Sequence, residues 1–322
     1  MTRRALLKAL AASAALFLAL PVAAQDWPQK PVRIVVPFAA GGNTDTIARI
    51  VAERLAAVFG QQFVVENRVG AGGAIAAEFV AKAPPDGYTL FVAAVSQIAI
   101  VPYIQKVQYD PVKDFAPISN IGTNPFVLGI HVSLPVKNLA EFVDYARANP
   151  GRLNFASGGN GSIGHLSGAL FAARAGLEMT HVPYRGGAPA VADLVAGQVH
   201  MYFGNASELI QHSRGGKIRL LGVSSERRAP QLPDVPAIAE TYPGFRTLTW
   251  NALFAPAGTP KPVIERIAAE VQKAVRDPAI GERLVKIGVD PLGSTPAELA
   301  ATVQADTAQW REVIRTANIR NE

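Results

Sequence analysis

The sequence predicts an α/β protein of two domains, with mostly parallel sheets flanked by helices. Strand-like apolar runs alternate with helix-like patterns along most of the 322 residues. No repeat of fixed period is apparent, and several predicted strands run into a helix through a glycine-rich loop. Alternation of this kind is typical of parallel sheets with helices on both faces.

The N-terminal third contains the first strand and helix units. The apolar run at 32–36 predicts a buried strand, and the three- and four-residue spacing of apolar residues from Ile47 to Phe59 predicts an amphipathic helix. Strands are expected next at 63–65 and 88–95, with a helix at 74–82 between them.

The middle of the chain continues the alternation, and the C-terminal part adds helices. Strands are expected at 126–130, 153–156, 180–182, 199–203, 218–223 and 250–255, and helices at 139–148, 163–176, 188–196, 263–276, 279–286 and 296–316. Residues 230–243 are rich in proline and predict an extended connection. We therefore assign 25–125 plus 246–322 to domain I and 126–245 to domain II, with a cleft at the strand ends between them.

The N-terminus predicts export. Arg3, Arg4 and Lys8 precede an apolar run at 9–20, and Val22 and Ala24 fit the small-residue rule of a cleavage site, so residues 1–24 are expected to be a signal peptide. The double arginine also approaches a twin-arginine signal, and both export routes stay open. The expected location is the periplasm. An uncleaved membrane anchor and an amphipathic helix of a cytosolic protein are the weaker alternatives.

Charge and composition exclude several classes of protein. The chain has 31 basic and 25 acidic residues, and removal of three basic residues with the signal peptide leaves 28 − 25 = +3. Such a small and scattered excess does not favour nucleic acid. Cysteine is absent, which excludes disulfides and thiolate ligands, and the five histidines lack metal-ligand spacing. We expect neither a metal nor a cofactor.

The loop between the first strand and its helix is the first candidate site. It contains Gly41 and Gly42, whose small size lets backbone N–H groups approach a ligand at the positive end of the helix dipole. This chemistry holds an anion without reacting with it. Asp45, in the first helical turn, either stabilises that helix or contacts a hydroxyl, amine or water of a ligand.

Further candidates follow other predicted strands. Ser157 to Ser162 and Tyr184 to Ala188 form two more glycine-rich loops, each before a helix. Asn205 lies just past the strand at 199–203, and Ser96 with Gln97 follows the strand at 88–95. Several strand ends that meet at one cleft indicate a binding site better than any single loop does.

Enzymatic motifs are weak here. Residues 159–164 match G-x-G-x-x-G, but the next strand ends at Tyr184 and Arg185 without the acidic residue that a dinucleotide site needs. The nucleophile elbow, the Walker loop and H-E-x-x-H do not occur. Ser162 and His165 leave a secreted Ser/His hydrolase open as an alternative.

The chain resembles one family over nearly its whole length: the extracytoplasmic solute receptors of tripartite tricarboxylate transporters, also called Bug-type receptors. The resemblance is carried by PFAAGGNTDTIAR at 37–49, VENRVGAGGAIAAEFVAKAPPDGYTL at 65–90, the loop at 157–165, VPYRGGAPAVADLVAGQV at 182–199 and FAPAGTP at 254–260. It implies a two-domain periplasmic-binding-protein (Venus-flytrap) fold that captures a carboxylate and delivers it to membrane transporter subunits. It implies a binding protein rather than an enzyme, and we expect a monomer.

The resemblance also implies site residues. In the first domain they are Phe38, Ala40, Gly41 and Gly42, with Asp45 beside them. In the second domain they are Ser157, Gly161, Ser162, His165, Tyr184, Gly186 and Ala188. Positions Ser96, Gln97 and Asn205 vary across the family and are where ligand identity is expected to be set. A carboxylate sensor that serves no transporter remains an alternative role.

Overall fold

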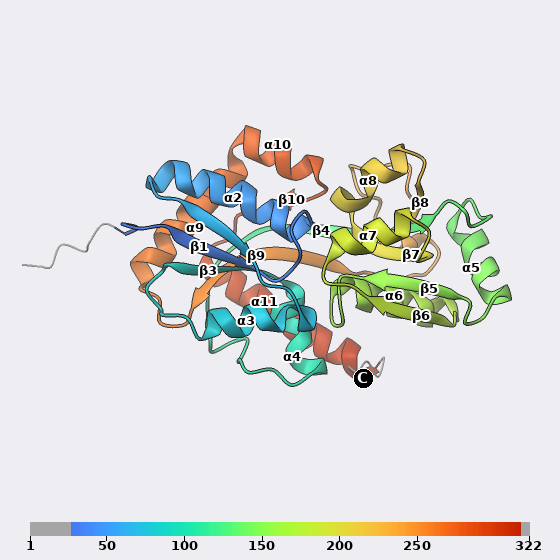
Figure 1. Ribbon diagram of the computed structural model, residues 1–322, viewed down its shortest axis with the longest axis horizontal. Helices are drawn as coiled ribbons and strands as arrows, with labels where there is room; N and C mark the ends of the chain where they lie inside the picture. Colours follow the sequence, from blue (N-terminus) through green and yellow to red (C-terminus); the bar gives the residue numbers. More distant parts are fainter. Residues whose placement is uncertain (1–26, 317–322) are drawn as a thin grey trace, which may run out of the picture.

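The structure is a computed structural model that describes residues 27–316, so the predicted signal peptide lies outside the described residues. Figure 1 shows two lobes joined by long strands. We call lobe A the elements built around strands β1, β2, β3 and β9, and lobe B those built around β5, β6, β7 and β8.

The sheet of lobe A is covered by helices on both faces. Its strands run in the order β2 (Phe63–Asn67), β1 (Val32–Val36), β3 (Thr89–Ala94), β9 (Leu248–Pro256) and the first part of β4 (Phe115–His131), with β10 (Asp290–Pro291) on β4. Helices α2 (Asn43–Phe59), α9 (Lys261–Arg276) and α10 (Pro278–Lys286) pack on one face. Helices α3 (Ala74–Ala81) and α11 (Pro296–Thr316) pack on the other.

Alternating side chains of β1 explain why both faces of this sheet are buried. Ile34 and Val36 belong to the core beneath α2 and α9, whereas Val35 belongs to the core beneath α3. Successive side chains of a strand point to opposite faces, so a continuous apolar run is what a strand covered on both sides requires.

Lobe B repeats the arrangement with a smaller sheet. Its strands run β6 (Met179–Pro183), β5 (Leu153–Ser157), β7 (Met201–Asn205) and the second part of β4, which also pairs with β8 (Ile218–Val223). Helices α5 (Leu139–Ala148) and α6 (Ile163–Ala175) pack into one core, and α7 (Gly187–Val195) and α8 (Ala206–Arg214) into another.

Strand β4 belongs to both sheets. It pairs with β9 as far as Pro125 and with β7 from Phe126 onward, so the proposed boundary at 125–126 lies inside one continuous strand. The chain returns through 224–247, where Ser224 N–H donates to the carbonyl of Phe126 and Thr247 N–H to that of Ser224.

The α/β fold and its flanking helices are confirmed, but the sheets are mixed rather than mostly parallel. Strands β1, β2 and β3 are mutually parallel, as are β5, β6 and β7. Every antiparallel pairing among the described residues involves β4 or β9, the two strands that run between the lobes. Because the chain crosses from one lobe to the other and later returns, the strands that connect the lobes run in opposite directions.

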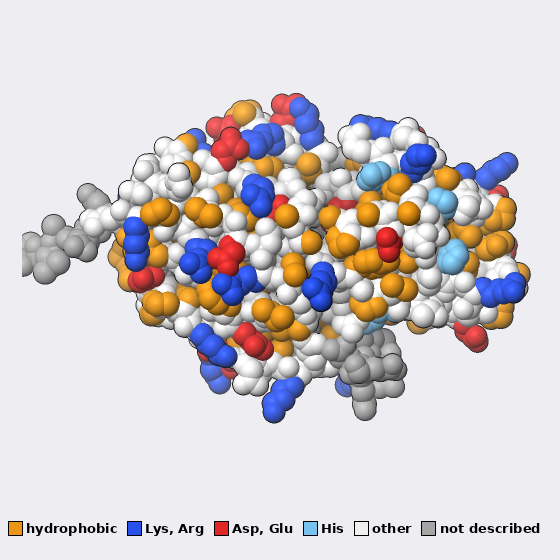
Figure 2. Space-filling view, viewed as in Figure 1, with side chains coloured by type: hydrophobic (Ala, Val, Ile, Leu, Met, Phe, Trp, Pro, Cys, Tyr) orange, Lys and Arg blue, Asp and Glu red, His pale blue; other side chains and the backbone are white. Residues whose placement is uncertain are grey.

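The predicted elements occur with shifted ends, and several others were missed. These are the first half of β4, the short helices η1 (Ala71–Gly73), η2 (Ser96–Ile100) and α4 (Val101–Ile104), helix α8 and the two-residue strand β10. The connection at 230–243 also contains a short turn, η3 (Ile238–Glu240). Within residues 27–316, no helix has the length and apolar character needed to cross a membrane. Figure 2 shows acidic and basic side chains interspersed on the face turned to the viewer.

Candidate functional site

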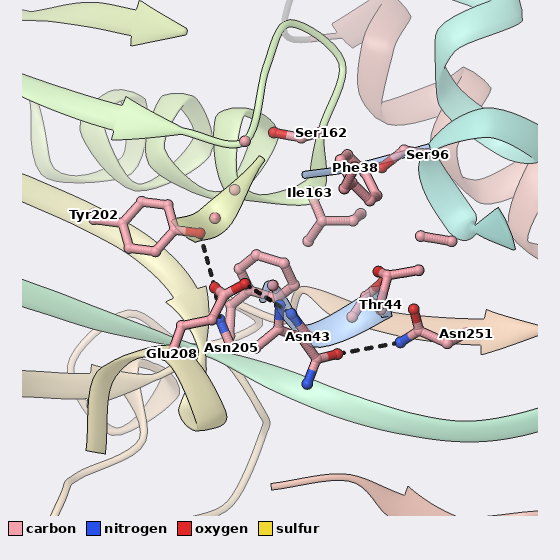
Figure 3. Close-up of a pocket in the computed structure, with 17 residues that line it drawn as sticks. Phe38, Asn43, Thr44, Ser96, Ser162, Ile163, Tyr202, Asn205, Glu208 and Asn251 are labelled. Atoms are coloured by element: carbon pink, nitrogen blue, oxygen red, sulfur yellow. Dashed lines mark hydrogen bonds between the residues drawn. The ribbon is translucent and has the colours of Figure 1, made fainter. Parts of the chain in front are cut away.

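A cavity of about 50 Å³ lies between the two lobes, at the ends of strands β3 and β7. Lobe A and lobe B both contribute to its wall (Figure 3). The lining residues are Phe38, Gly42, Asn43, Thr44, Ala94, Ser96, Phe126, Gly158, Ser162, Ile163, Gly164, Gly187, Tyr202, Asn205, Glu208, Thr249 and Asn251. Five of the predicted site residues are among them: Phe38, Gly42, Ser96, Ser162 and Asn205.

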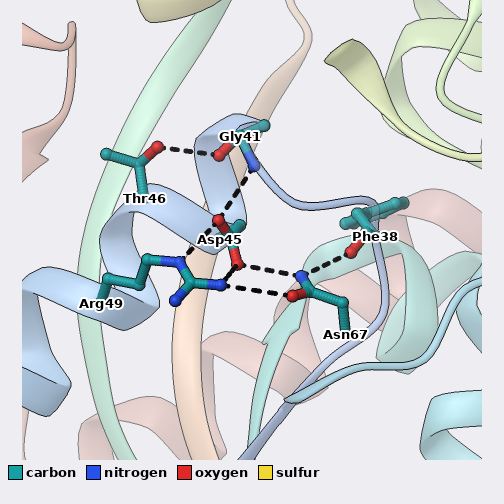
Figure 4. Close-up of polar contacts among 7 residues, drawn as sticks. Phe38, Gly41, Asp45, Thr46, Arg49 and Asn67 are labelled. Carbon is teal, nitrogen blue, oxygen red and sulfur yellow. Dashed lines mark hydrogen bonds and ion pairs between the residues drawn. The ribbon is translucent and has the colours of Figure 1, made fainter. Parts of the chain in front are cut away.

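Asp45 holds the first glycine-rich loop in shape rather than facing the cavity (Figure 4). Its carboxylate accepts hydrogen bonds from Gly41 N–H at 2.9 Å, from the Arg49 guanidinium at 2.9 and 3.0 Å, and from Asn67 Nδ2 at 2.9 Å. Asn67 Nδ2 also donates to the carbonyl of Phe38 at 2.9 Å. Of the two roles expected for Asp45, this geometry fits stabilisation of its own helix and loop.

The protonation state of Asp45 follows from these contacts. Burial alone would raise the pKa of Asp45, but hydrogen bonds from Arg49, Gly41 and Asn67 outweigh it and hold the pKa below its ordinary value. Because the Gly41 N–H is used by Asp45, it is not offered to a ligand. Gly41, with φ of 83°, is exposed, as is Ala40.

The loop at Ser157 to Ser162 rests on a stack of two histidines. The rings of His165 and His181 lie 4.0 Å apart with an interplanar angle of 11°. His181 Nε2 is 2.7 Å from Ser157 Oγ, and His165 Nδ1 accepts from Gly161 N–H at 3.2 Å. Burial lowers the pKa of His165 to about 4, and burial with the neighbouring His165 lowers that of His181 to about 3. Both rings are therefore neutral at pH 7 and support the loop.

Ser162 is the N-cap of α6. Its Oγ accepts from the main-chain N–H of His165 at 3.2 Å, while the His165 ring bonds Gly161 instead. The side chain to side chain pair that a Ser/His hydrolase would need is not what this spacing produces. Ser162 still lines the cavity, where its hydroxyl proton is available as a donor.

The loop at Tyr184 to Ala188 touches lobe A directly. Ala39 N–H donates to the carbonyl of Arg185 at 3.2 Å. Gly186 has φ of 135°, and a Cβ there would lie 2.9 Å from Ala39 N. The Tyr184 hydroxyl donates to Asp193 at 2.5 Å, and burial with this bond raises the pKa of Tyr184 to about 12. Tyr184 lines a more open groove at the mouth of the cleft, and Ala188 is not among the residues that line either space.

Ser96 and Gln97 are adjacent but play different parts. Ser96 lines the cavity. The buried Gln97 side chain accepts from Ala94 N–H at 3.0 Å and donates to the carbonyl of Gly72 at 2.7 Å, which ties β3 to the neighbouring loop. Gln97 is therefore placed to support the site from behind.

Glu208 is the most consequential lining residue that the sequence analysis missed. It lies in the first turn of α8, and its carboxylate accepts from Tyr202 Oη at 2.9 Å and Asn205 N–H at 3.1 Å. Across the cleft it accepts from Asn43 N–H at the start of α2, at 3.2 Å. Burial raises the pKa of Glu208 despite these donors. A Cβ at Gly187 would overlap this carboxylate, so glycine leaves it room.

Asn43, Asn251 and Asn124 were also missed. Asn43 Nδ2 donates to Ser207 Oγ at 2.9 Å, and Asn251 Nδ2 to Asn43 Oδ1 at 3.4 Å. Asn124 Nδ2 donates to Asn205 Oδ1. Among residues 27–316, the Oδ1 atoms of Asn124 and Asn251 have no hydrogen-bond partner, although both residues are 1% exposed. Asn43 begins α2 directly after Gly42, which was the available sequence signal, whereas Asn124 and Asn251 lie inside β4 and β9.

The described lining residues offer groups that form hydrogen bonds. They supply hydroxyls, amides, helix N-termini and the Glu208 carboxylate, and none of them is Lys, Arg or His. No group of three or more metal-ligating side chains occurs in the part of the chain that the structure describes.

The chain is similar in sequence to a known family of receptors. A family model described as "Tripartite tricarboxylate transporter family receptor" matches residues 47–319. A relative from Pseudomonas sp. strain P51, the UPF0065 protein in the tcbD-tcbE intergenic region, is 42% identical, and the match covers 89% of this chain and 86% of the relative.

Two solved structures are similar over nearly their whole length. R. palustris Rpa4515 with adipate has a TM-score of 0.89 and 38% identity, covering 91% of this chain and 99% of that one. MatC (Rpa3494) from Rhodopseudomonas palustris with bound malate has a TM-score of 0.85 and 35% identity, covering 89% and 100%.

Proposed function

The chain belongs to the tripartite tricarboxylate transporter family of receptors, as its likeness to Bug-type receptors implied, and we propose that it captures a small organic carboxylate between lobes A and B and delivers it to membrane transporter subunits. Receptors of this family are periplasmic binding proteins. The proposal includes export by residues 1–24, reversible binding without bond chemistry, and action as a monomer.

The observation that carries the proposal is the convergence of helix N-termini on one cavity. Helices α2, α6, α7 and α8 all begin at lining residues: Asn43, Ile163, Gly187 and the N-cap Asn205. Each helix start carries partial positive charge, which stabilises a carboxylate. At the starts of α2 and α8, Asn43 N–H and Asn205 N–H already donate to Glu208, so the starts of α6 and α7 are the places expected to receive a ligand carboxylate. The similar proteins named with adipate and malate support a carboxylate as the ligand class.

Closure of the lobes is the second part of the proposal. Contacts such as Ala39 to Arg185 and Asn43 to Glu208 join lobe A to lobe B only when the lobes are together. The connections at β4 and at 224–247 are the places where a hinge would act. A ligand that binds the closed form more tightly would shift the population toward it.

A thermal-shift screen followed by calorimetry tests the proposal. The purified mature protein is titrated with adipate, malate, succinate and benzoate, and with glucose and putrescine as uncharged and cationic controls. A ligand at about 100 times its Kd stabilises the native state by about 2.7 kcal/mol. A protein stabilised by glucose or putrescine but by no carboxylate would refute the proposed ligand class.

Incubation of the same protein with carboxylate esters tests the hydrolase alternative. We expect no product. Ester turnover that disappears in Ser162→Ala would replace the binding proposal with an enzyme.

A further inference from the structure

The cavity has two chemically different ends. Figure 3 shows Ser162 and Ser96 on one side and Glu208, Asn43 and Asn251 on the opposite side. We call the first the hydroxyl end and the second the acceptor end. The hydroxyl end also includes the start of α6 and can donate hydrogen bonds to a carboxylate.

The acceptor end is defined by two groups that accept hydrogen bonds. Glu208 brings a carboxylate into the wall of the cavity, and its bond from Asn43 N–H exists only while α2 and α8 are together. Asn251 Oδ1 has no partner within residues 27–316, although its side chain is buried and lines the same cavity. A buried acceptor without a donor destabilises the empty site, and a ligand donor placed there would remove that cost.

These two groups are linked through one residue. Asn43 donates its main-chain N–H to Glu208 and accepts from Asn251 Nδ2 through its side-chain oxygen. The carboxylate and the unpartnered oxygen therefore flank the same helix start. A second ligand carboxylate placed there would meet an acceptor and a negative charge, without a Lys, Arg or His among the described lining residues to balance them.

We infer that the ligand carries, besides the carboxylate held at the hydroxyl end, a hydrogen-bond donor that binds Glu208 and Asn251, and that it is an amino or hydroxy acid rather than a plain dicarboxylate. This inference rests on the proposed capture of a carboxylate and adds which carboxylates are selected. Glu208 acts as the specificity-determining residue, and an ammonium would pair with it more strongly than a hydroxyl.

Calorimetry on three four-carbon acids tests the inference without any variant. Succinate, malate and aspartate share a chain length and two carboxyl groups, but malate adds a hydroxyl and aspartate an ammonium group. We expect aspartate or malate to bind about ten- to hundredfold more tightly than succinate, the range of one hydrogen bond to a charged group. The same comparison is repeated with adipate and 2-aminoadipate to allow for ligand length.

Two glutamate variants then assign the selectivity. Glu208→Gln keeps the size of the side chain and one acceptor oxygen but removes the charge. In this variant the affinity for malate or aspartate, divided by the affinity for succinate, should be within about threefold of one. Glu298→Gln is the matched control, because Glu298 also lies in the first turn of its helix and accepts from the preceding Thr295 N–H at 2.8 Å, but it is exposed. It should leave the ratio unchanged.

The outcomes separate this inference from the proposed function. If no carboxylate in either series or in the thermal-shift screen binds, both are overturned. If the acids bind, but wild-type protein binds succinate and adipate as tightly as or more tightly than malate, aspartate and 2-aminoadipate, carboxylate capture stands and the inference is overturned. A wild-type preference that persists undiminished in folded Glu208→Gln also overturns it.

Discussion

Replacing Asp45 by Asn should destabilise the protein through the loop that forms one wall of the cavity. The Asp45 side chain is 3% exposed and accepts four hydrogen bonds from three residues. An asparagine has one acceptor oxygen, and its NH₂ group would face the donors of Gly41 or Arg49. Arg49 is half exposed and can turn to water, so the loss falls mainly on Gly41 and Asn67.

The expected size is about 2–3 kcal/mol, because hydrogen bonds to charged groups contribute about 1.5–3 kcal/mol each and part of the network relaxes. For a chain of this size that corresponds to a melting temperature lower by roughly 3–5 °C at pH 7. Carboxylate affinity should fall as well, since Asn67 ties the same network to the carbonyl of Phe38.

The pH dependence identifies the cause. The folded pKa of Asp45 lies below its ordinary value, because its hydrogen-bond donors outweigh the effect of burial. The ionised carboxylate therefore adds stability above the unfolded pKa near 4, and this stability is lost as the pH falls through the folded pKa. The melting curves of wild type and Asp45→Asn, measured by circular dichroism from pH 7 to pH 3, should converge below about pH 4.

Glu53→Gln is the control for the assay. Glu53 also pairs with an arginine, Arg283, at 2.9 Å, but its side chain is 68% exposed, so its melting temperature should stay near that of wild type. The reasoning is wrong if Asp45→Asn melts within 1 °C of wild type at pH 7, a threshold below the shift expected, or if the gap between them stays constant down to pH 3.

Three further predictions follow from glycine geometry, the tyrosine hydroxyl and the histidine stack. Gly161→Val should reduce carboxylate affinity at least about tenfold, because a Cβ at position 161 would lie 2.7 Å from a side chain of lobe A. Gly60→Val is the comparison, since Gly60 has a similar positive φ but lies in open space. It should cost about 1–3 kcal/mol of stability and leave carboxylate affinity unchanged. Equal affinities by calorimetry would contradict this. Tyr184→Phe should change affinity by less than about threefold, since its hydroxyl is engaged by Asp193; a larger loss would place the hydroxyl in the site. The rings of His165 and His181 stay neutral in the folded protein, whereas in the unfolded chain they take up protons near pH 6.5. The free energy of unfolding, measured in urea, should therefore fall by about 2 kcal/mol per ring from pH 7 to pH 5. His165→Phe should flatten that slope, and an unchanged slope would contradict the assignment.

Local patterns predicted most of the fold because each element signals itself within a few residues. The run at 32–36 and the helix after it depend only on apolar periodicity and on a loop that begins the helix. Strand β4 is different: its first half contains Pro117, Gly122 and Pro125, and its register shifts twice against β9. Residues of this kind argue against a strand locally, and only pairing with a distant strand overrides them.

The candidate site was predictable in position but not in chemistry. The glycine-rich loops do meet between the lobes, as strand ends in an open sheet predict. Which loop atoms remain available could not be read from the sequence, since Asp45 takes the Gly41 N–H and Asp193 takes the Tyr184 hydroxyl. These contacts depend on rotamers, and a motif does not specify them.

Glu208 shows how one missed local signal can hide a functional residue. Asn205 and Glu208 form a capping box, Asn-x-x-Glu at the start of α8, and the sequence analysis placed no helix there. Had the box been recognised, it would still have explained Glu208 as a capping residue, since its bond to Asn205 N–H is local. Its bond to Asn43 spans 165 residues and exists only because two lobes meet. Glu208 caps its own helix and accepts a hydrogen bond from the start of a helix in the other lobe. On the inference above, the residue that takes part in closing the cleft is therefore also the one that selects the ligand.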